Sequence, residues 1–154
     1  MVGSALRISE ATSLAMHTMA LLGSGSGPEV SSREIAGSLG VSQAHLQKVL
    51  QRLGRAGLVH SERGPRGGFT LAQPPERITL LEVYEAIEGP LHLVDCLFSK
   101  PACRGGRCIL GGLVGLVNDQ FGTYLRETTL ADLAGSAPAA GRKKAEGDRH
   151  ADAA

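Results

Sequence analysis

The stretch from Ser31 to Gly57, SSREIAGSLGVSQAHLQKVLQRLGRAG, constrains the fold most strongly, because it holds two amphipathic helices with almost no chain between them. Ser31 and Glu34 have the spacing of a capping box, which predicts the start of the first helix. Gly40 ends that helix, and the second begins at once with Val41 and Ser42. The expected inward positions are Ile35, Ala36 and Leu39 in the first helix and Leu46, Val49, Leu50 and Leu53 in the second. Two short helices joined in this way predict a helix-turn-helix.

Further elements are expected on both sides of this pair. Before it, Ser9 can cap a helix whose apolar positions run to Leu22, until GSGSGP at 23–28 breaks the pattern. After it, LVHSER (58–63) and GFTLA (68–72) are short extended segments, and GPRGG between them supplies the turn of a hairpin. A hairpin directly after a helix-turn-helix predicts a wing.

A capped helix and a long apolar helix follow the hairpin. Thr79 and Glu82 again have capping-box spacing, and Gly89 with Pro90 ends the helix that they open. Residues from Ile109 to about Arg126 are apolar on nearly every face, so a helix there must be buried. A single copy of 154 residues offers little core for it, and we therefore expect it to pack against a second copy in a two-fold dimer.

These elements divide the chain into four expected segments. A winged helix-turn-helix domain covers residues 6–89, a cysteine loop covers 90–108, a dimerisation helix with a short terminal helix covers 109–134, and a disordered tail rich in Ala, Gly and charge covers 135–154. The predicted fold class is mainly α with a small β-hairpin: a winged helix-turn-helix domain plus a long C-terminal dimerisation helix.

Composition limits the classes of partner. The net charge of +1 gives no overall attraction to nucleic acid, so DNA binding needs local groups of Arg and Lys. The chain has neither a basic and apolar leader nor a run of about 18 apolar residues, which predicts a cytoplasmic protein with no membrane partner. In that reducing compartment, three cysteines are expected to be ligands or redox thiols rather than a disulfide framework.

The second helix of the pair presents a surface without a single acidic residue. At about 100° per residue, the face opposite its apolar stripe carries Ala44, Lys48, Gln51 and Arg55, flanked by Gln43, Gln47 and Arg52. Amides and cations suit a major groove, where Gln pairs with adenine and Arg or Lys with guanine or phosphate. Arg63 and Arg66 of the hairpin are placed to reach the neighbouring minor groove or its phosphates. The alternative is a solvated basic face on an ordinary three-helix core, but the order of capped helix, turn, acid-free helix and basic hairpin favours DNA binding.

The sequence SREIAGSLGVSQAHLQKVLQRLGRAGLVHSERGPRGGFTLA, followed by ITLLEVYEAIEG, resembles the Rrf-two family of bacterial winged helix-turn-helix regulators over roughly Leu6 to Leu133. The resemblance implies a homodimer joined through the long C-terminal helix, double-stranded promoter DNA as the partner and, in many members, a cysteine-bound iron-sulfur cluster in the loop before that helix. It implies DNA contacts at Ala44, His45, Gln47, Lys48 and Arg63. Together with the surface reasoning above, the full set expected at the DNA is Ser42, Gln43, Ala44, His45, Gln47, Lys48, Gln51, Arg52, Arg55, Arg63 and Arg66.

All the cysteines of the chain, Cys96, Cys103 and Cys108, lie in one short loop with the spacing C-x6-C-x4-C, which differs from the C-x2-C of a zinc ribbon. Thiolates are the soft ligands that iron-sulfur clusters use, and Gly105 and Gly106 let the backbone wrap around such a group. Three cations in the loop favour the thiolate form: Lys100, Arg104 and Arg107. Incidental thiols, a thiol switch without a cluster and a zinc site are the alternatives.

Three thiolates leave one ligand position open, so a 2Fe-2S or a 4Fe-4S cluster is compatible with the chain. One branch of the Rrf-two family places a histidine three residues after the last cysteine, where this chain has Gly111. Another branch takes a carboxylate from the first helix of the other subunit; the matching position here is Ser13, and Glu10 lies one turn earlier. The candidates for the fourth ligand are therefore Glu10 of the partner subunit, His92 and Ser13.

These features predict a dimeric bacterial transcriptional regulator that senses redox state, nitric oxide or iron-sulfur status through a cluster held by three cysteines. The alternatives are a regulator of the same fold that uses thiol oxidation without a cluster, and an iron-sulfur electron carrier. No Gly-rich phosphate loop, nucleophile constellation or paired carboxylates accompany the cysteines, so the chain is not expected to be an enzyme.

Overall fold

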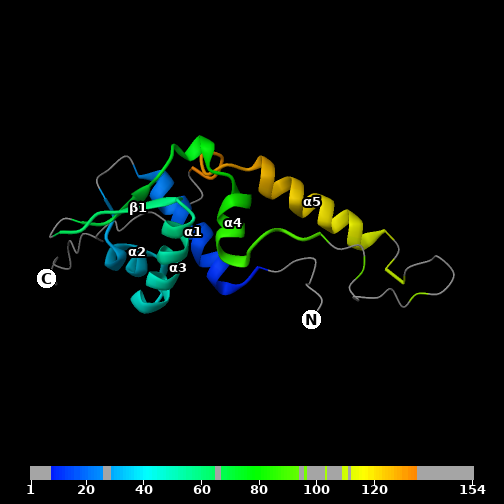
Figure 1. The fold of residues 1–154 in the computed structure, drawn as a ribbon, viewed down its shortest axis with the longest axis horizontal. Helices are drawn as coiled ribbons and strands as arrows, with labels where there is room; N and C mark the ends of the chain where they lie inside the picture. The colour runs from blue at the N-terminus through cyan, green and yellow to red at the C-terminus, as the bar shows by residue number, and fades with distance from the viewer. Residues whose placement is uncertain are drawn as a thin grey trace, which may run out of the picture.

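The computed structural model describes residues 8–25, 29–64, 67–93, 96, 103, 109–110 and 112–134. In chain order its elements are α1 (Glu10–Ser24), α2 (Ser32–Leu39), α3 (Gln43–Arg55), β1 (Val59–Ser61), β2 (Phe69–Leu71), a 3-10 turn (Pro75–Arg77), α4 (Leu80–Glu88) and α5 (Leu113–Glu127). In Figure 1, α1 to α4 form one body with the β1–β2 hairpin at one end, and α5 extends away from that body. The predicted fold class, mainly α with one small hairpin, is confirmed by this arrangement. Across the described ranges, none of the helices has the length and apolarity of a membrane span.

Each of the first four helices begins at a hydroxyl side chain that accepts a hydrogen bond from the backbone three residues on. These residues are Ser9, Ser31, Ser42 and Thr79. Both predicted capping boxes are complete, because Glu34 and Glu82 accept in return from the cap backbone N–H groups. Gly40 adopts φ 65°, a left-handed conformation that costs glycine little and that turns the chain from α2 into α3. Local sequence therefore sets the start of these helices, with each cap stabilising by about 0.5–2 kcal/mol.

The hairpin is tied to the start of the helix-turn-helix. β1 and β2 pair antiparallel, with Val59 opposite Leu71. Val30, just before α2, forms a bridge to β2: its N–H donates to the Phe69 carbonyl at 3.1 Å, and the Phe69 N–H donates back at 2.9 Å. A Cβ atom at Gly68 would lie 2.8 Å from the Val30 carbonyl oxygen, so only glycine permits this approach. The wing is thereby fixed relative to α2 and α3.

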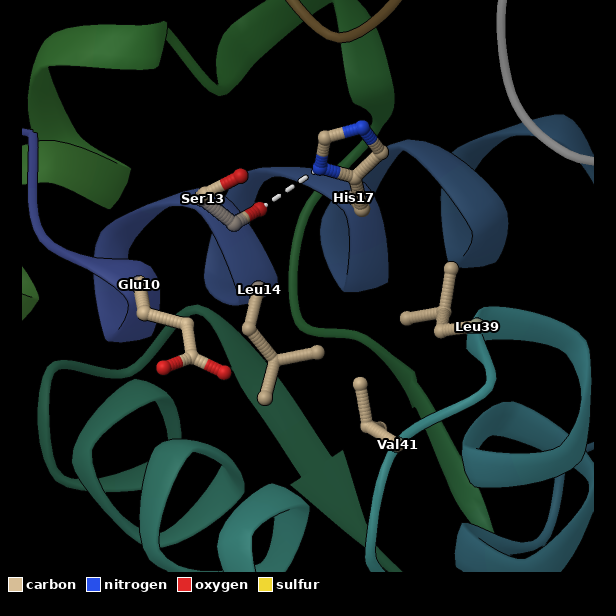
Figure 2. Close-up of a pocket in the computed structure, with 6 residues that line it drawn as sticks. All are labelled: Glu10, Ser13, Leu14, His17, Leu39 and Val41. Carbon is tan, nitrogen blue, oxygen red and sulfur yellow. Dashed lines mark hydrogen bonds between the residues drawn. The ribbon is translucent and has the colours of Figure 1, made fainter.

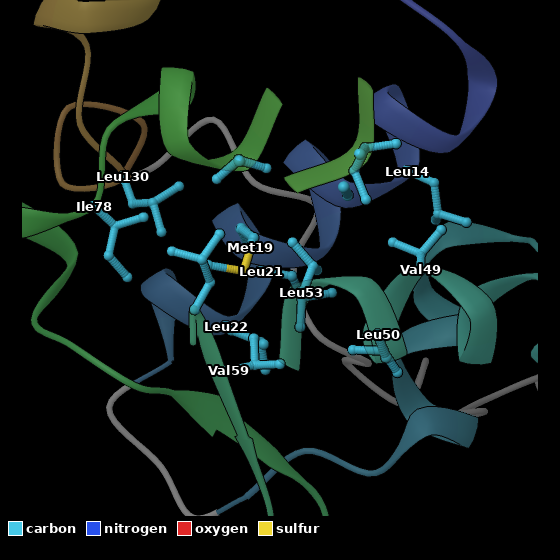
Figure 3. Packing of buried hydrophobic residues seen from close by; sticks show 14 of the residues in the cluster. Leu14, Met19, Leu21, Leu22, Val49, Leu50, Leu53, Val59, Ile78 and Leu130 are labelled. Atoms are coloured by element: carbon cyan, nitrogen blue, oxygen red, sulfur yellow. The ribbon is translucent and has the colours of Figure 1, made fainter. Parts of the chain in front are cut away.

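The hydrophobic core gathers around α1, as Figure 3 shows. The largest fully buried apolar side chains include Met19 and Leu21 of α1, Ile35 of α2, Leu46, Leu50 and Leu53 of α3, Ile78 before α4 and Leu130 after α5. All four predicted inward positions of α3 are buried, and burying each such side chain stabilises by about 1.5–3 kcal/mol. This burial sets the rotation of α3, so that its opposite face points outward.

The C-terminal helix differs from its prediction in length. Ile109 and Leu110 lie in a turn, Gly112 caps the helix, and α5 begins at Leu113 rather than at Ile109. Glycine is among the poorest helix formers, which accounts for the later start. The expected short terminal helix is instead a run of turns over 130–134, although Leu130 is buried in the core. The expected tail, 135–154, lies outside the described residues.

Candidate functional site

The outward face of α3 carries polar and cationic side chains. Ser42, Gln43, Ala44, Lys48, Gln51, Arg52 and Arg55 are exposed, whereas His45 and Gln47 are partly buried. No acid occurs between Gln43 and Arg55. The structure thus brings most of the predicted α3 residues onto one accessible surface.

Two of these glutamines are held by a residue that sequence reasoning did not single out. Gln43 Nε2 donates to Ser32 Oγ at 2.9 Å, and Gln47 Nε2 donates to the same oxygen at 3.1 Å. Ser32 is the first residue of α2, next to the capping Ser31. The only signal in the sequence was a second serine in SSRE, and its contact with the glutamines cannot be inferred before the packing of α2 against α3 is known.

Arg52 is turned toward α4 rather than toward the open face of α3. Its Nη1 donates to the Ile87 carbonyl at 3.2 Å. Ile87 lies in the last turn of α4, where carbonyls lack helical partners and the helix dipole favours a cation. Arg52, an expected flanking DNA contact, is therefore hydrogen-bonded within the fold although its side chain stays exposed, as those of Lys48 and Arg55 do.

His45 lies on the side of α3 that faces the start of α1. Its Nδ1 is 4.0 Å from Glu10 Oε1, and the His45 side chain is 34% exposed whereas that of Glu10 is 86% exposed. The pair is an ion pair only when the imidazole is protonated. Glu10 thus sits beside the recognition surface and is open to a further partner.

The wing adds one described cation to this surface. Arg63 follows β1 and is exposed in the hairpin connection. Arg66, the second predicted wing residue, lies outside the described residues. The hairpin is joined to α2 through Val30 and Phe69, so Arg63 is displayed by an element fixed to the helix-turn-helix.

A hollow of about 230 Å³ separates α1 from the α2–α3 turn. Figure 2 shows its lining side chains, which are Glu10, Ser13, Leu14, His17, Leu39 and Val41. The His17 ring donates from Nδ1 to the Ser13 carbonyl at 2.7 Å, which fixes the imidazole against its own helix. Both first-helix candidates for a fourth ligand, Glu10 and Ser13, therefore line one open hollow.

The start of the cysteine loop is bonded to α4. Gly89 ends α4 with φ 87°, and the Leu91 N–H then donates to Glu85 Oε1 at 2.9 Å. His92 is exposed one residue later. The path of the chain into the loop is therefore set by α4.

The structure describes two of the three predicted sulfur ligands. Cys96 and Cys103 are free thiols and partly buried, and Cys108 lies outside the described residues. Over the ranges that the structure describes, three or more His, Cys, Asp or Glu side chains do not gather into a metal-binding group. The fit to an iron-sulfur cluster rests on donor chemistry, because free, partly exposed thiols in one loop are the ligands that such a cluster uses.

The last turn of α4 contacts both α1 and α3 just before the cysteine loop begins. Glu88 Oε1 accepts from the Ser9 N–H at 3.2 Å and from the Thr12 hydroxyl. The neighbouring Ile87 carbonyl accepts from Arg52 of α3. We call these contacts the α4 junction. They connect the loop to the helix that carries Glu10 and to the helix that carries the polar face.

One side of α5 exposes three large apolar side chains beside the polar Gln120 and Glu127. Leu113, Leu116 and Tyr124 lie within about 80° of one another around the helix and are 53–61% exposed. The other side packs inward through Val114, Asn118, Gly122 and Leu125. At its edge, Phe121 meets Tyr84 of α4 edge to face, with ring centroids 5.7 Å apart. A single copy of the chain thus leaves an apolar stripe uncovered.

Comparison with known proteins supports these observations. Residues 8–136 match the Rrf2 family, described as iron-dependent transcriptional regulator. An HTH-type transcriptional repressor NsrR of Streptomyces coelicolor is 30% identical over 131 residues, or 83% of this chain and 88% of the relative. An HTH-type transcriptional regulator NsrR of Bacillus licheniformis is 34% identical over 110 residues, or 68% of this chain and 74% of the relative. This chain covers as little as 63% of the length of other curated relatives.

A solved structure is similar over nearly its whole length. CymR, described as the global cysteine regulator of Bacillus subtilis, has a TM-score of 0.71 and 28% identity, covering 85% of this chain and 98% of CymR. The relatives are regulators rather than enzymes, in agreement with the sequence prediction. The match to the family over most of the chain and the winged helix-turn-helix geometry together identify this protein as a transcriptional regulator of the Rrf2 family.

Proposed function

We propose that this regulator binds promoter DNA as a homodimer, with α3 in the major groove and the wing at the neighbouring minor groove, and that Cys96, Cys103 and Cys108 hold an iron-sulfur cluster whose state sets DNA affinity. The observation that carries the DNA proposal is the exposed, acid-free face of α3 beside the exposed Arg63 of the wing. Lys48 and Arg55 supply phosphate or guanine contacts, and Gln47 and Gln51 supply base-edge contacts.

The exposed stripe of α5 supports the dimer. Leu113, Leu116 and Tyr124 lie on the side of α5 away from the core, so a second copy can cover them without displacing any described contact. Covering such a stripe removes apolar surface from water, which favours association. Two-fold symmetry would then present two α3 helices to half-sites about 34 Å apart.

The thiols and the family description support the cluster. The matched family is described as iron-dependent, and the free thiols of Cys96 and Cys103 are the donor type that iron-sulfur clusters require. When bound, such a group supplies a centre that reacts with oxidants and nitric oxide. The fourth ligand is proposed to be Glu10 of the partner subunit, because that carboxylate is exposed and its one described contact, at 4.0 Å to His45, is long. His92 and Ser13 are the other candidates.

The α4 junction offers a route from the cysteine loop to the DNA-binding face. A shift of the loop acts first on Gly89 and the last turn of α4. That turn bonds α3 through Arg52 and α1 through Ser9 and Thr12, so its displacement alters how α3 is held. An allosteric coupling of about 1–3 kcal/mol corresponds to a roughly five- to 150-fold change in affinity.

A regulator that uses thiol oxidation without a cluster is the second candidate. One observation favours it: the position where one branch of the family has a histidine is Gly111 in this chain. Peroxide treatment of such a protein yields a sulfenate or disulfide. Mass spectrometry of the intact protein and iron analysis separate the two candidates.

The DNA proposal is tested by selecting binding sites from randomised duplexes with the full-length protein. We expect an inverted repeat whose half-sites are one helical turn apart. Recovery of no preferred sequence, with binding no tighter than to random DNA, contradicts the proposal.

A further inference from the structure

A single hydroxyl on α2 holds two amide side chains of the proposed recognition helix. Ser32 Oγ accepts from Gln43 Nε2 at 2.9 Å and from Gln47 Nε2 at 3.1 Å. The two glutamines are one helical turn apart, so both reach the same point on the neighbouring helix. This contact joins the two helices on the side that faces the proposed DNA.

Hydroxyl chemistry restricts how these amides are oriented. A serine hydroxyl has one proton and two lone pairs, so it cannot donate to two amide oxygens at once. At least one glutamine must therefore present an N–H to Ser32, whichever way each amide is assigned. In the observed arrangement both amides do so, and each keeps its Oε1 and its second N–H for another partner.

An amide held in this way matches one base edge. Bidentate recognition of adenine needs one acceptor for the N6 amino group and one donor for N7. A glutamine whose amide is fixed by Ser32 offers these two groups in one order, whereas a freely rotating amide offers either order. Holding the side chain before binding also reduces the conformational entropy that is lost on binding.

Ser32 has no evident role in capping α2. The cap is Ser31, whose hydroxyl accepts from the Glu34 N–H and whose own N–H donates to the Glu34 carboxylate. The helix start is therefore complete without the Ser32 side chain. Removing this hydroxyl is expected to leave the fold intact.

We propose that Ser32 is a specificity-determining positioning residue, which fixes the edges that the Gln43 and Gln47 amides present to DNA bases. The inference rests on the proposed function, namely that α3 enters the major groove. Its expected effect is a change in discrimination between bases rather than in overall attraction to DNA. Immobilising one side chain in advance corresponds to about three- to tenfold in affinity for the correct base.

The test measures affinities of the full-length protein for its selected site, for single-base variants of that site and for random DNA. The variants are Ser32→Ala, Gln43→Ala, Gln47→Ala, the double variant Gln43→Ala/Gln47→Ala, the triple variant that combines all three changes, and Ser38→Ala as a control elsewhere on α2. Ser32→Ala is expected to lose about three- to tenfold in discrimination at the bases that Gln43 and Gln47 read, with affinity for random DNA unchanged. Adding Ser32→Ala to the Gln43→Ala/Gln47→Ala protein is expected to have no further effect, because the groups that Ser32 positions are gone.

Two results overturn the inference. One is a Ser32→Ala protein with the base discrimination of the wild type. The other is a Ser32→Ala effect that persists undiminished when both glutamines are absent. If the wild-type protein selects no site at all, the proposed function itself has failed; if Gln47→Ala and Lys48→Ala alter binding while Ser32→Ala does not, only the role of Ser32 is refuted.

Discussion

Replacing Glu88 by Ala tests the α4 junction, because this carboxylate joins the end of α4 to the start of α1. The substitution removes the acceptor of two hydrogen bonds, from the Ser9 N–H at 3.2 Å and from the Thr12 hydroxyl. Hydrogen bonds to a charged group contribute about 1.5–3 kcal/mol each, and Glu88 is only partly buried, which places its bonds at the lower end of that range. Thr12 is fully buried but keeps a contact to Ser9 Oγ at 3.1 Å, so its hydroxyl does not lose every partner.

Two such bonds sum to about 3 kcal/mol, and since Thr12 keeps a partner we expect Glu88→Ala to lower the free energy of unfolding by about 2–3 kcal/mol. The assay is urea unfolding at neutral pH, with Glu76→Gln as the control because Glu76 is exposed and its side chain makes no hydrogen bond or ion pair with the residues that the structure describes. The control should change stability by less than about 0.5 kcal/mol.

A double-mutant cycle with Thr12→Val isolates the bond between the two side chains. A coupling of about 1 kcal/mol is expected between Glu88→Ala and Thr12→Val. If the two stability changes are strictly additive, or if the Glu88→Ala protein is as stable as the Glu76→Gln control, the carboxylate does not hold α1 against α4. The contact between α4 and α1 would then not belong to the proposed route.

Three further perturbations follow from the described contacts. Lys48→Ala should reduce the slope of log affinity against log salt concentration by about one, whereas Gln47→Ala should relax base preference and leave that slope unchanged. If both variants behave identically in anisotropy titrations, the assignment of Lys48 to phosphate and of Gln47 to a base is contradicted. Leu116→Glu should yield monomers in analytical ultracentrifugation, because the new charge would be buried where two α5 helices pair. The exposed control Asp119→Lys should stay dimeric, and a dimeric Leu116→Glu protein would place the interface elsewhere. Hydrogen bonds from the Ser31 side chain and backbone hold the pKa of Glu34 below its ordinary 4.5, so this carboxylate adds stability above pH 4.5 that is lost as the pH falls through its lowered pKa. The wild type should therefore lose stability relative to Glu34→Gln on acidification below that value, and parallel pH profiles would refute the effect.

The helix starts and the hairpin could be predicted from sequence because their causes are local. Ser9, Ser31 and Thr79 each bond a backbone group three residues away, and Gly40 adopts a conformation that needs no distant partner. The inward stripe of α3 could be predicted for the same reason, because helical periodicity alone places its four apolar residues on one side.

The interhelical contacts could not be predicted from these signals. Ser32 meets Gln47 across fifteen positions of sequence, and Arg52 meets Ile87 across 35. Both contacts depend on how α2 and α4 pack against α3, which periodicity does not specify. Arg52 therefore looked like part of the DNA face, although its guanidinium is bonded to the end of α4.

The α5 prediction was wrong at the N-terminal boundary of the helix. Apolar residues from Ile109 onward suggested one continuous helix, but glycine at position 112 delays the start to Leu113. Leu116 and Tyr124 are exposed in one copy of the chain, and the dimer that was inferred from the apolar helix stays a prediction. The roles assigned to Cys108 and Arg66 stay predictions, because both residues lie outside the described ranges.

The most direct test of the account is one measurement on anaerobically purified protein: its affinity for the selected DNA site before and after removal of bound iron and sulfide, with both elements quantified. The account predicts coloured protein that contains iron and acid-labile sulfide, loses both when Cys96, Cys103 and Cys108 are replaced by Ser, and changes its affinity roughly five- to 150-fold on removal. Colourless protein after reconstitution with iron and sulfide, binding its site with unchanged affinity, contradicts the account.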